Sequence, residues 1–286
     1  MKRIISFLVI ICLVIPMFSV GCTKNKSVKT RCYEQYNEVL NRYLKKYGQP
    51  EIVDSNKIWN NSIKENVVQG GDFYVCRGVC FAELINIDNK KPEELMVVYA
   101  HNDFIDVMDN SEKLNKLIKK GARAYTMEVW KYNSNKTKRI FRGEVMNYYR
   151  DVVPNSDIIF GKMNKGIMIR NGFKGGLGVK DMEINDYSYV DNEFVQVNQC
   201  CETEGGEVFI NNRKVGGTVD EVVKKETESD NYFEDNVEEI ITYSLLARKD
   251  AINDSTNPIL RANATIKKIN DYLIVSKDSD SYKEME

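Results

Sequence analysis

Between residues 30 and 47, apolar and aromatic side chains recur at the three- to four-residue spacing of an α-helix. This face carries Tyr33, Tyr36, Leu40, Tyr43, Leu44 and Tyr47. Gly48 and Pro50 follow, and residues of these types commonly end helices. We expect an amphipathic helix whose tyrosine-rich face packs on a sheet, with binding of carbohydrate or of a partner protein as the alternative use of that face.

The middle of the chain shows the patterns of β-strands. Residues 79–87 and 95–99 are almost continuously apolar, which predicts strands buried on both faces. Two hairpins are expected further on, formed by residues 124–132 with 138–145 and by 157–161 with 166–170. Residues 187–200 and 207–210 add further strands, and residues 111–120 form a short helix between Ser111 and Gly121.

Near the C-terminus the period changes to that of helices. Thr218 and Glu221 match a capping box that opens one helix, the apolar positions Val237, Ile240, Ile241 and Leu245 indicate a second, and Asn257 with Pro258 opens a third. These patterns predict an α+β fold, with an N-terminal helix, a mainly antiparallel sheet and C-terminal helices. The expected segments are a β-rich main domain over residues 30–215, a helical part over 216–275 and a frayed tail over 276–286.

The first 21 residues differ from the rest of the chain. Lys2 and Arg3 precede a run of apolar residues from 4 to 20, which only Ser6, Pro16 and Ser19 interrupt. A charged start followed by an apolar stretch is typical of a secretory signal peptide. The run is shorter than the roughly 20 residues of a membrane span and has no basic flank behind it, so a cleaved signal is favoured over a membrane anchor.

The end of this segment, Phe18-Ser19-Val20-Gly21-Cys22, resembles a bacterial lipobox, although Ser19 stands where leucine is usual. The resemblance implies cleavage after residue 21, attachment of lipid, including a palmitate-type acyl chain, to Cys22, and a polar tether over residues 22–29. Two or three acyl chains on one residue make anchoring stable. We therefore expect a lipoprotein of the cell envelope, bound to the cell membrane through Cys22 and facing outside the cytoplasm. The alternative is an ordinary signal peptide with an incidental cysteine.

The charge balance and the cysteine content bear on which ligands and metal sites to expect. Lys and Arg number 41 against 42 Asp and Glu, and this overall balance gives the chain as a whole no electrostatic footprint for nucleic acid or for anionic lipid. The five cysteines after Cys22 are an odd number in a compartment that permits disulfides. Their pairing stays open in the sequence; buried free thiols are favoured over a zinc site formed by Cys76, Cys80, Cys200 and Cys201, with Cys32 as the fifth.

One acidic loop, residues 83–95, lies between the two most apolar strands. Its frame resembles the calcium-type loops of FG-GAP and VCBS β-repeats, and together with residues 126–130 and 208–215 it resembles uncharacterised lipoproteins of low-GC Gram-positive bacteria. By this resemblance Asn86, Asp88 and Glu94 take oxygen-donor positions for calcium. Lys90 replaces a third donor and Lys91 the turn glycine, so a loop that has lost its ion, with no cofactor bound, is the favoured interpretation.

The inventory for catalysis is small. His101 is the one histidine, at the end of a strand where we expect it to be solvated, and no nucleophile-elbow, zinc-protease or P-loop motif occurs. Glu83, Glu128 and Glu144 are the candidate carboxylates for glycoside hydrolysis. The sequence favours a non-catalytic module that binds an envelope protein or an extracellular ligand, with a surface hydrolase as the alternative. A solute-binding protein of two doubly wound lobes is disfavoured, because strands and helices do not alternate.

Overall fold

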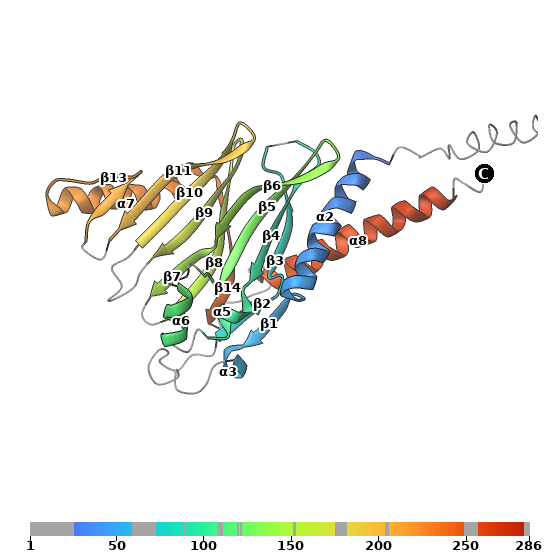
Figure 1. Ribbon diagram of the computed structural model, residues 1–286. Coiled ribbons are helices and arrows are strands. Elements are labelled where there is room, and N and C mark those ends of the chain that lie inside the picture. The colour runs from blue at the N-terminus through green and yellow to red at the C-terminus, as the bar shows by residue number, and fades with distance from the viewer. Residues whose placement is uncertain are drawn as a thin grey trace, which may run out of the picture.

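The computed structural model describes residues 26–58, 73–88, 90–107, 111–118, 120, 122–150, 153–174, 182–203, 206–248 and 257–282. They form two packed β-sheets with helices on the outer faces (Figure 1). Helices α2 (Val28–Tyr47) and α8 (Pro258–Tyr282) cover the smaller sheet, and helix α7 (Val219–Asn236) covers part of the larger one. The expected α+β fold, with helices towards both ends of the chain and mainly antiparallel sheets, is confirmed.

The smaller sheet, called sheet B, has four strands in the order β3-β4-β5-β6, and all its pairings are antiparallel. Its strands are β3 (Phe81–Ile85), β4 (Glu94–Ala100), β5 (Tyr125–Asn133) and β6 (Lys136–Glu144). Every residue of β4 is buried, because this apolar strand lies between the helices on one face and the larger sheet on the other. The predicted buried strands and the hairpin of β5 with β6 are therefore confirmed.

The larger sheet, sheet A, has ten strands in the order β1-β2-β14-β8-β7-β9-β10-β11-β12-β13. Their bounds are β1 Glu51–Asp54, β2 Phe73–Arg77, β7 Met146–Arg150, β8 Val153–Met163, β9 Gly166–Lys174, β10 Met182–Val190, β11 Glu193–Glu202, β12 Val208–Ile210, β13 Arg213–Lys214 and β14 Glu239–Arg248. Strands β7 and β9 are parallel over a short stretch, and the other pairings between described strands are antiparallel. The expected hairpin of residues 157–161 with 166–170 appears as β8 and β9.

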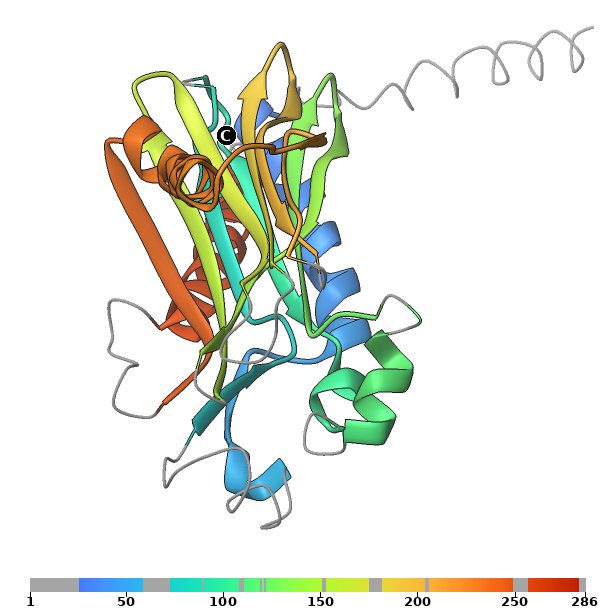
Figure 2. The same cartoon turned by 90° about the vertical axis from the view of Figure 1, so that its left-hand side faces the viewer.

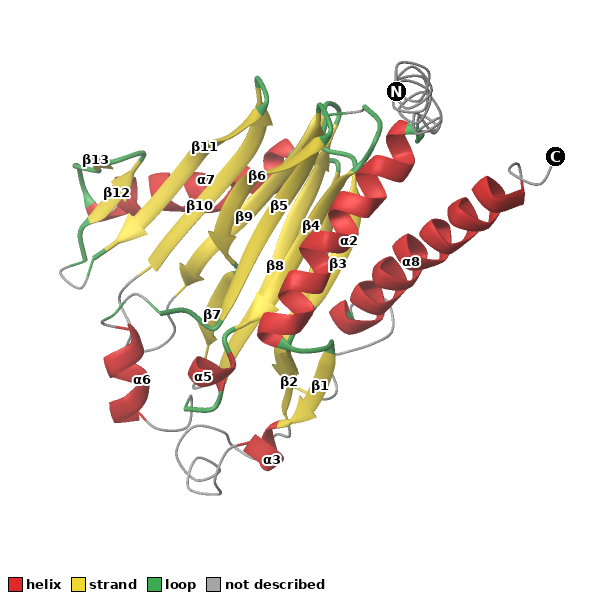
Figure 3. Cartoon of the chain, turned by 45° about the vertical axis from the view of Figure 1, so that its right-hand side comes forward, coloured by secondary structure: helices red, strands yellow, loops and turns green. Residues whose placement is uncertain are grey.

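The helices over sheet B are placed by their apolar faces. Ser27 caps α2 by accepting a hydrogen bond from the backbone N–H of Thr30, and the tyrosine face then packs on the sheet as predicted. The Tyr36 hydroxyl is fully buried and donates to the carbonyl of Glu93 at 2.9 Å. Helix α8 lies beside α2, as Figure 3 shows, and adds Ala262 and Ile269 to the same core.

Helix α7 lies across the outer face of sheet A, where it contacts strands β11 and β12 (Figure 2). Its first turn has the predicted capping box between Thr218 and Glu221. Beneath the helix, Arg170 holds both carboxylate oxygens of Asp186, at 2.7 and 3.0 Å, and also donates to the backbone carbonyl of Asp230 at 2.8 Å. This buried ion pair fixes α7 to the sheet.

Short helices occupy the lower edge of the sandwich: α3 (Ser55–Ile58), α5 (Asn102–Ile105) and α6 (Ser111–Ile118). The last of these confirms the helix expected from residue 111. The structure differs from the sequence-based expectation for the C-terminal part in two respects. The helix predicted over Val237, Ile240, Ile241 and Leu245 is wrong, because this stretch is strand β14, and residues 216–275 therefore contain a strand of sheet A. Isoleucine, threonine and tyrosine favour a pleated strand, and the pairing with β8 overrides the helical spacing.

Candidate functional site

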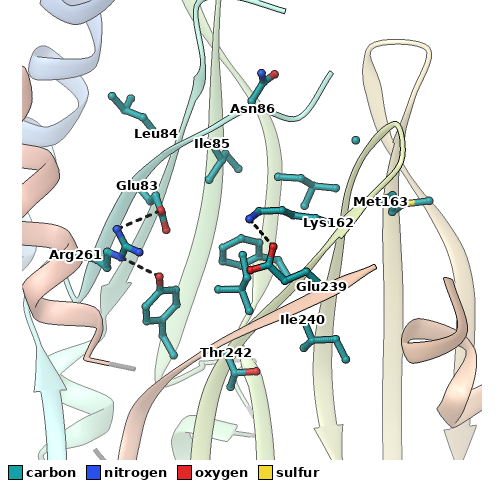
Figure 4. A pocket seen from close by; sticks show the side chains of 15 residues that line it. Glu83, Leu84, Ile85, Asn86, Lys162, Met163, Glu239, Ile240, Thr242 and Arg261 are labelled. Atoms are coloured by element: carbon teal, nitrogen blue, oxygen red, sulfur yellow. Dashed lines mark hydrogen bonds and ion pairs between the residues drawn. The ribbon is translucent and has the colours of Figure 1, made fainter. Parts of the chain in front are cut away.

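A cleft of about 730 Å³ opens where strand β3 of sheet B faces strand β14 of sheet A (Figure 4). Residues 83–86 form one wall, residues 239–243 form the other, and the tip of the β8–β9 hairpin closes one end. Arg261, in the first turn of α8, reaches into it from the side. A cleft of this volume is within the range of sites that bind small molecules or a few residues of a peptide.

In the described part of the chain, strand β3 and the stretch of β14 that lines the cleft each pair with a neighbouring strand on one side only. Strand β3 pairs with β4 alone. Strand β14 pairs with β8 over Glu239–Leu246 but meets β2 only at Leu246, Ala247 and Arg248. In an antiparallel edge strand, every second residue directs its N–H and C=O groups away from its neighbour. The cleft is therefore bordered by two strand edges with backbone groups available for pairing.

Four charged side chains line the cleft. Lys162 of β8 contacts Glu239 of β14 at 2.6 Å, and both are exposed. Arg261 lies 3.9 Å from Glu83, and its Nε donates to the Tyr243 hydroxyl at 3.0 Å. Two cations and two anions leave the cleft without net charge, so it favours neither anions nor cations as a class.

Glu83 and Asn86 supply buried acceptor atoms at the cleft wall. The Oε2 atom of Glu83 and the Oδ1 atom of Asn86 are buried without a hydrogen-bond partner in the described part of the chain. Burial raises the pKa of Glu83 above the usual glutamate value, and the positive charge of Arg261 opposes that rise. An unsatisfied buried acceptor costs about 1–3 kcal/mol, so both atoms favour a ligand that brings N–H or O–H donors.

The carboxylates of the acidic loop contact the ammonium group of a lysine from a neighbouring strand. The Nζ atom of Lys131, on strand β5, lies 2.6 Å from Asp88 and 3.0 Å from Glu94. Asp88 also accepts from the backbone N–H of Lys90, and Glu94 accepts from that of Ile87. Of the three expected calcium ligands, the structure brings Asp88 and Glu94 together around this ammonium group, whereas Asn86 lines the cleft.

Charge interactions within this cluster are strong. Burial lowers the pKa of Lys131, but hydrogen bonds with Asp88, Tyr189 and Glu94 outweigh it and raise the pKa above the ordinary lysine value. Burial raises the pKa of Glu94, and Lys131 opposes the rise.

Across the described residues, no group of three or more His, Cys, Asp or Glu side chains is arranged to hold a metal ion. Lys131 thus supplies the positive charge between Asp88 and Glu94.

Glu128, a second candidate carboxylate, is enclosed on the opposite face of sheet B from Glu83. Its carboxylate accepts hydrogen bonds from the hydroxyls of Tyr43 and Tyr99 and from Trp130, and it contacts Arg139 at 3.0 Å. Its side chain is only 2% exposed. A carboxylate held by so many donors under helix α2 stabilises the packing of that helix and is not placed to meet a substrate.

His101 and Glu144 lie together at the other end of sheet B. They line a hollow of about 420 Å³ in which Glu144 pairs with Arg123. His101 is half-buried, contacts Thr126 at 2.9 Å and packs against the rings of Tyr47 and Tyr99. The rings cover one part of His101 while another part lines the hollow, so it is only partly solvated, and burial lowers its pKa below the usual histidine value. The three candidate carboxylates thus take part in three separate ion pairs.

Among the described residues, Cys32, Cys76, Cys80 and Cys200 are free thiols, and Cys201 forms no disulfide. Cys32, Cys76, Cys80 and Cys200 are buried, and Cys201 is half-buried. Burial raises the pKa of Cys200 to about 11, so this thiol stays protonated and unreactive at neutral pH. The expectation of buried free thiols is confirmed for four of the five.

The expected lipidation residue, Cys22, lies outside the described residues, as does the glycine-rich stretch 175–178. Within the described part, no helix combines the length and the apolar character needed to cross a bilayer. Four residues of the cleft, Lys162, Glu239, Tyr243 and Arg261, carry no sequence signal of a site. They meet only through the pairing of β14 with β8 and the start of α8.

Comparisons with protein-family models, with curated proteins and with solved structures gave no match to this chain.

Proposed function

We propose that the protein is an extracytoplasmic lipoprotein whose cleft binds an extended peptide segment of an envelope or extracellular partner. One observation carries the binding part of this proposal: the cleft lies between β3, which pairs only with β4, and the stretch of β14 before Leu246, which pairs only with β8 among the described strands. An extended peptide adds to such an edge through main-chain hydrogen bonds, while pockets for alternate side chains give specificity. The burial of acceptor atoms at Glu83 and Asn86 supports a ligand rich in N–H donors.

The side chains of the cleft fit a peptide of mixed charge. Glu83 and Glu239 attract basic residues, and Lys162 and Arg261 attract acidic ones. Phe160 and Ile167 are buried at its base, so an apolar residue of the ligand would meet an apolar floor.

A peptide selection tests the binding proposal. Random peptides displayed on phage are selected on the chain from residue 23, which retains every described residue, and the enriched sequences are synthesised. We expect N-methylation of alternate amides to weaken binding by about tenfold, because each lost main-chain hydrogen bond contributes about 1 kcal/mol. Thr242→Trp, at an exposed position on β14, should block binding, whereas Val195→Trp, on the exposed face of β11, should leave it unchanged. Equal binding to both variants would reject the cleft as the site.

The lipid anchor is tested separately. The lipobox-like residues at 18–22 support it, together with the basic start and the apolar run before them. Cells that express the chain are grown with radiolabelled palmitate; label should enter the wild-type protein and be absent from Cys22→Ala. Label in the variant would place the acylation elsewhere.

A second candidate function is hydrolysis by paired carboxylates. It is favoured by Glu83 and Glu239, which lie on opposite walls of one cleft, with burial raising the pKa of the first and Lys162 pairing with the second (Figure 4). One protonated and one ionised carboxylate are the groups that glycoside hydrolysis needs. Release of soluble fragments from dye-labelled cell-wall glycan, abolished by both Glu83→Gln and Glu239→Gln, would favour hydrolysis over binding.

A further inference from the structure

The first turn of α2 and the later part of α8 lie side by side at one end of the molecule. Tyr272 of α8 packs edge to face on Tyr33 of α2, with ring centroids 4.9 Å apart, and its hydroxyl contacts Thr30 at 3.3 Å. Figure 3 shows both helices over sheet B, with the start of α2 and the end of α8 on the same side. Side chains of both helices therefore form one surface.

A groove of about 500 Å³ lies in this surface. It is lined by Val28, Lys29 and Tyr33 of α2, by Lys91, Pro92 and Glu93 of the loop before β4, and by Lys268 of α8. Three lysines against one glutamate make the groove basic, and Lys91 pairs with Glu93. The Lys29 ammonium lies over the ring of Tyr272 at 4.7 Å from its centroid. Amphipathic rings with lysines around them are typical of side chains at a membrane–water interface.

Exposed apolar side chains lie on the same two helices, and one of them, Val28, lines the groove. Val28 is 53% exposed, and Ile274 and Val275, just after Tyr272, are 59% and 66% exposed. Exposed apolar residues beside lysines are the combination by which helices attach to a bilayer surface, since the apolar groups enter the headgroup region and the cations meet anionic lipid.

The sequence places this end of the molecule close to Cys22. Six residue steps separate Cys22 from Val28, and an extended chain spans at most about 3.5 Å per residue, so the two lie within roughly 21 Å. A lipid on Cys22 would therefore hold the first turn of α2 next to the bilayer. The neighbouring α8 residues would be held there with it.

We propose that the surface formed by Val28, Lys29, Tyr33, Lys91, Lys268, Ile274 and Val275 binds the anionic phospholipid surface of the membrane. The orientation argument rests on the proposed lipidation of Cys22, but the binding itself is a property of the folded chain. Contact at this surface sets the protein upright on the membrane, with α2 and α8 towards the bilayer and α7 away from it.

Flotation of the chain from residue 23 with phospholipid vesicles tests this proposal without the lipid anchor. We expect binding to vesicles that contain phosphatidylglycerol to exceed binding to pure phosphatidylcholine by about tenfold, and to fall as salt is added, since lysines are attracted to an anionic surface and salt screens that attraction. The triple variant Lys29→Gln, Lys91→Gln, Lys268→Gln should lose that advantage. Ile274→Ser with Val275→Ser should weaken binding to a similar degree.

Matched controls are available on α7, at the opposite end of the molecule. Val219 and Val223 are 79% and 52% exposed, and Lys224 is also exposed, so Val219→Ser with Val223→Ser and Lys224→Gln with Lys225→Gln change the same residue types. Both control pairs should bind as the wild type does. Absence of vesicle binding, or equal losses in test and control variants, would overturn the proposal. Palmitate labelling of Cys22 is scored independently, so failure of the anchor and failure of this surface are distinguishable.

Discussion

Lys131 reaches from strand β5 into the acidic loop and lies 2.6 Å from Asp88, in the space between the two carboxylates where a bound cation would be expected. The side chains of Lys131 and Asp88 are 18% and 11% exposed, and that of Glu94 is 1% exposed. The two carboxylates of the loop are therefore held by a cation that belongs to the chain.

Lys131→Met removes this positive charge from two largely buried carboxylates. We expect it to lower the free energy of unfolding by about 3 kcal/mol, as is typical when one partner of a buried ion pair is lost. Urea unfolding at neutral pH measures the change. Lys90→Met is the control, because Lys90 lies 3.9 Å from the same Asp88 but its side chain is 75% exposed; it should change stability little.

The same substitution should create a response to calcium. With the ammonium gone, Asp88 and Glu94 become free to bind an ion, so excess calcium should raise the melting temperature of Lys131→Met by mass action and raise that of the wild type less. The double variant Lys131→Met, Asp88→Asn should not respond. An equal rise in wild type and Lys131→Met would show that calcium binds elsewhere.

Glu83 makes stability depend on pH in a definite direction. Because burial raises its pKa in the folded state, the fold prefers the protonated form, and stability falls as pH rises from the usual glutamate pKa to the raised one. Glu83→Gln removes this loss, so the variant should gain stability relative to the wild type at neutral pH and lose that advantage below about pH 4. Urea unfolding across this pH range measures the difference. Glu239→Gln, at an exposed position in the same cleft, is the control for the loss of a carboxylate there.

Gly78 forms a turn that only glycine fits. Its φ is +72°, and a Cβ atom would lie 2.0 Å from the carbonyl oxygen of Gln49. Gly78→Ala should therefore lower the free energy of unfolding by about 3 kcal/mol or more, because backbone must move. Gly206 is the control: its φ is +73°, but apart from its chain neighbours no described atom lies within 4 Å of the added Cβ, so Gly206→Ala should cost about 1 kcal/mol. Equal losses in both would point to the backbone conformation alone.

The periodic elements of the fold could be predicted from the sequence, and the cleft could not. The tyrosine face of α2, the apolar β4 and the capping box of α7 depend on neighbours in the chain, so their spacing indicates them. Strand β14 depends on pairing with distant strands, and its isoleucines also fit a helical spacing. Because that stretch was expected to be a helix, Glu239 and Tyr243 could not be placed opposite Glu83.

In the acidic loop, the two carboxylates could be predicted from the sequence, but their partner could not. Asp88 and Glu94 were found by their place in the loop, but their partner Lys131 comes from a strand beyond the next helices. The register of β5 against β4 brings Trp130 beside Leu95 and so directs Lys131 to the loop. Such a register is set by packing and cannot be read from the local sequence.

The position of β14 in sheet A also affects the order in which the strands can pair during folding. It pairs with β8 and, through Leu246 and Val75, with β2, so it joins strand β2 to the middle of the chain only after residue 248 has been made. Closing so long a loop has an entropic cost and slows folding. A product truncated before Glu239 would leave the edges of β2 and β8 open to pairing with other chains, so β14 protects these two strands against aggregation.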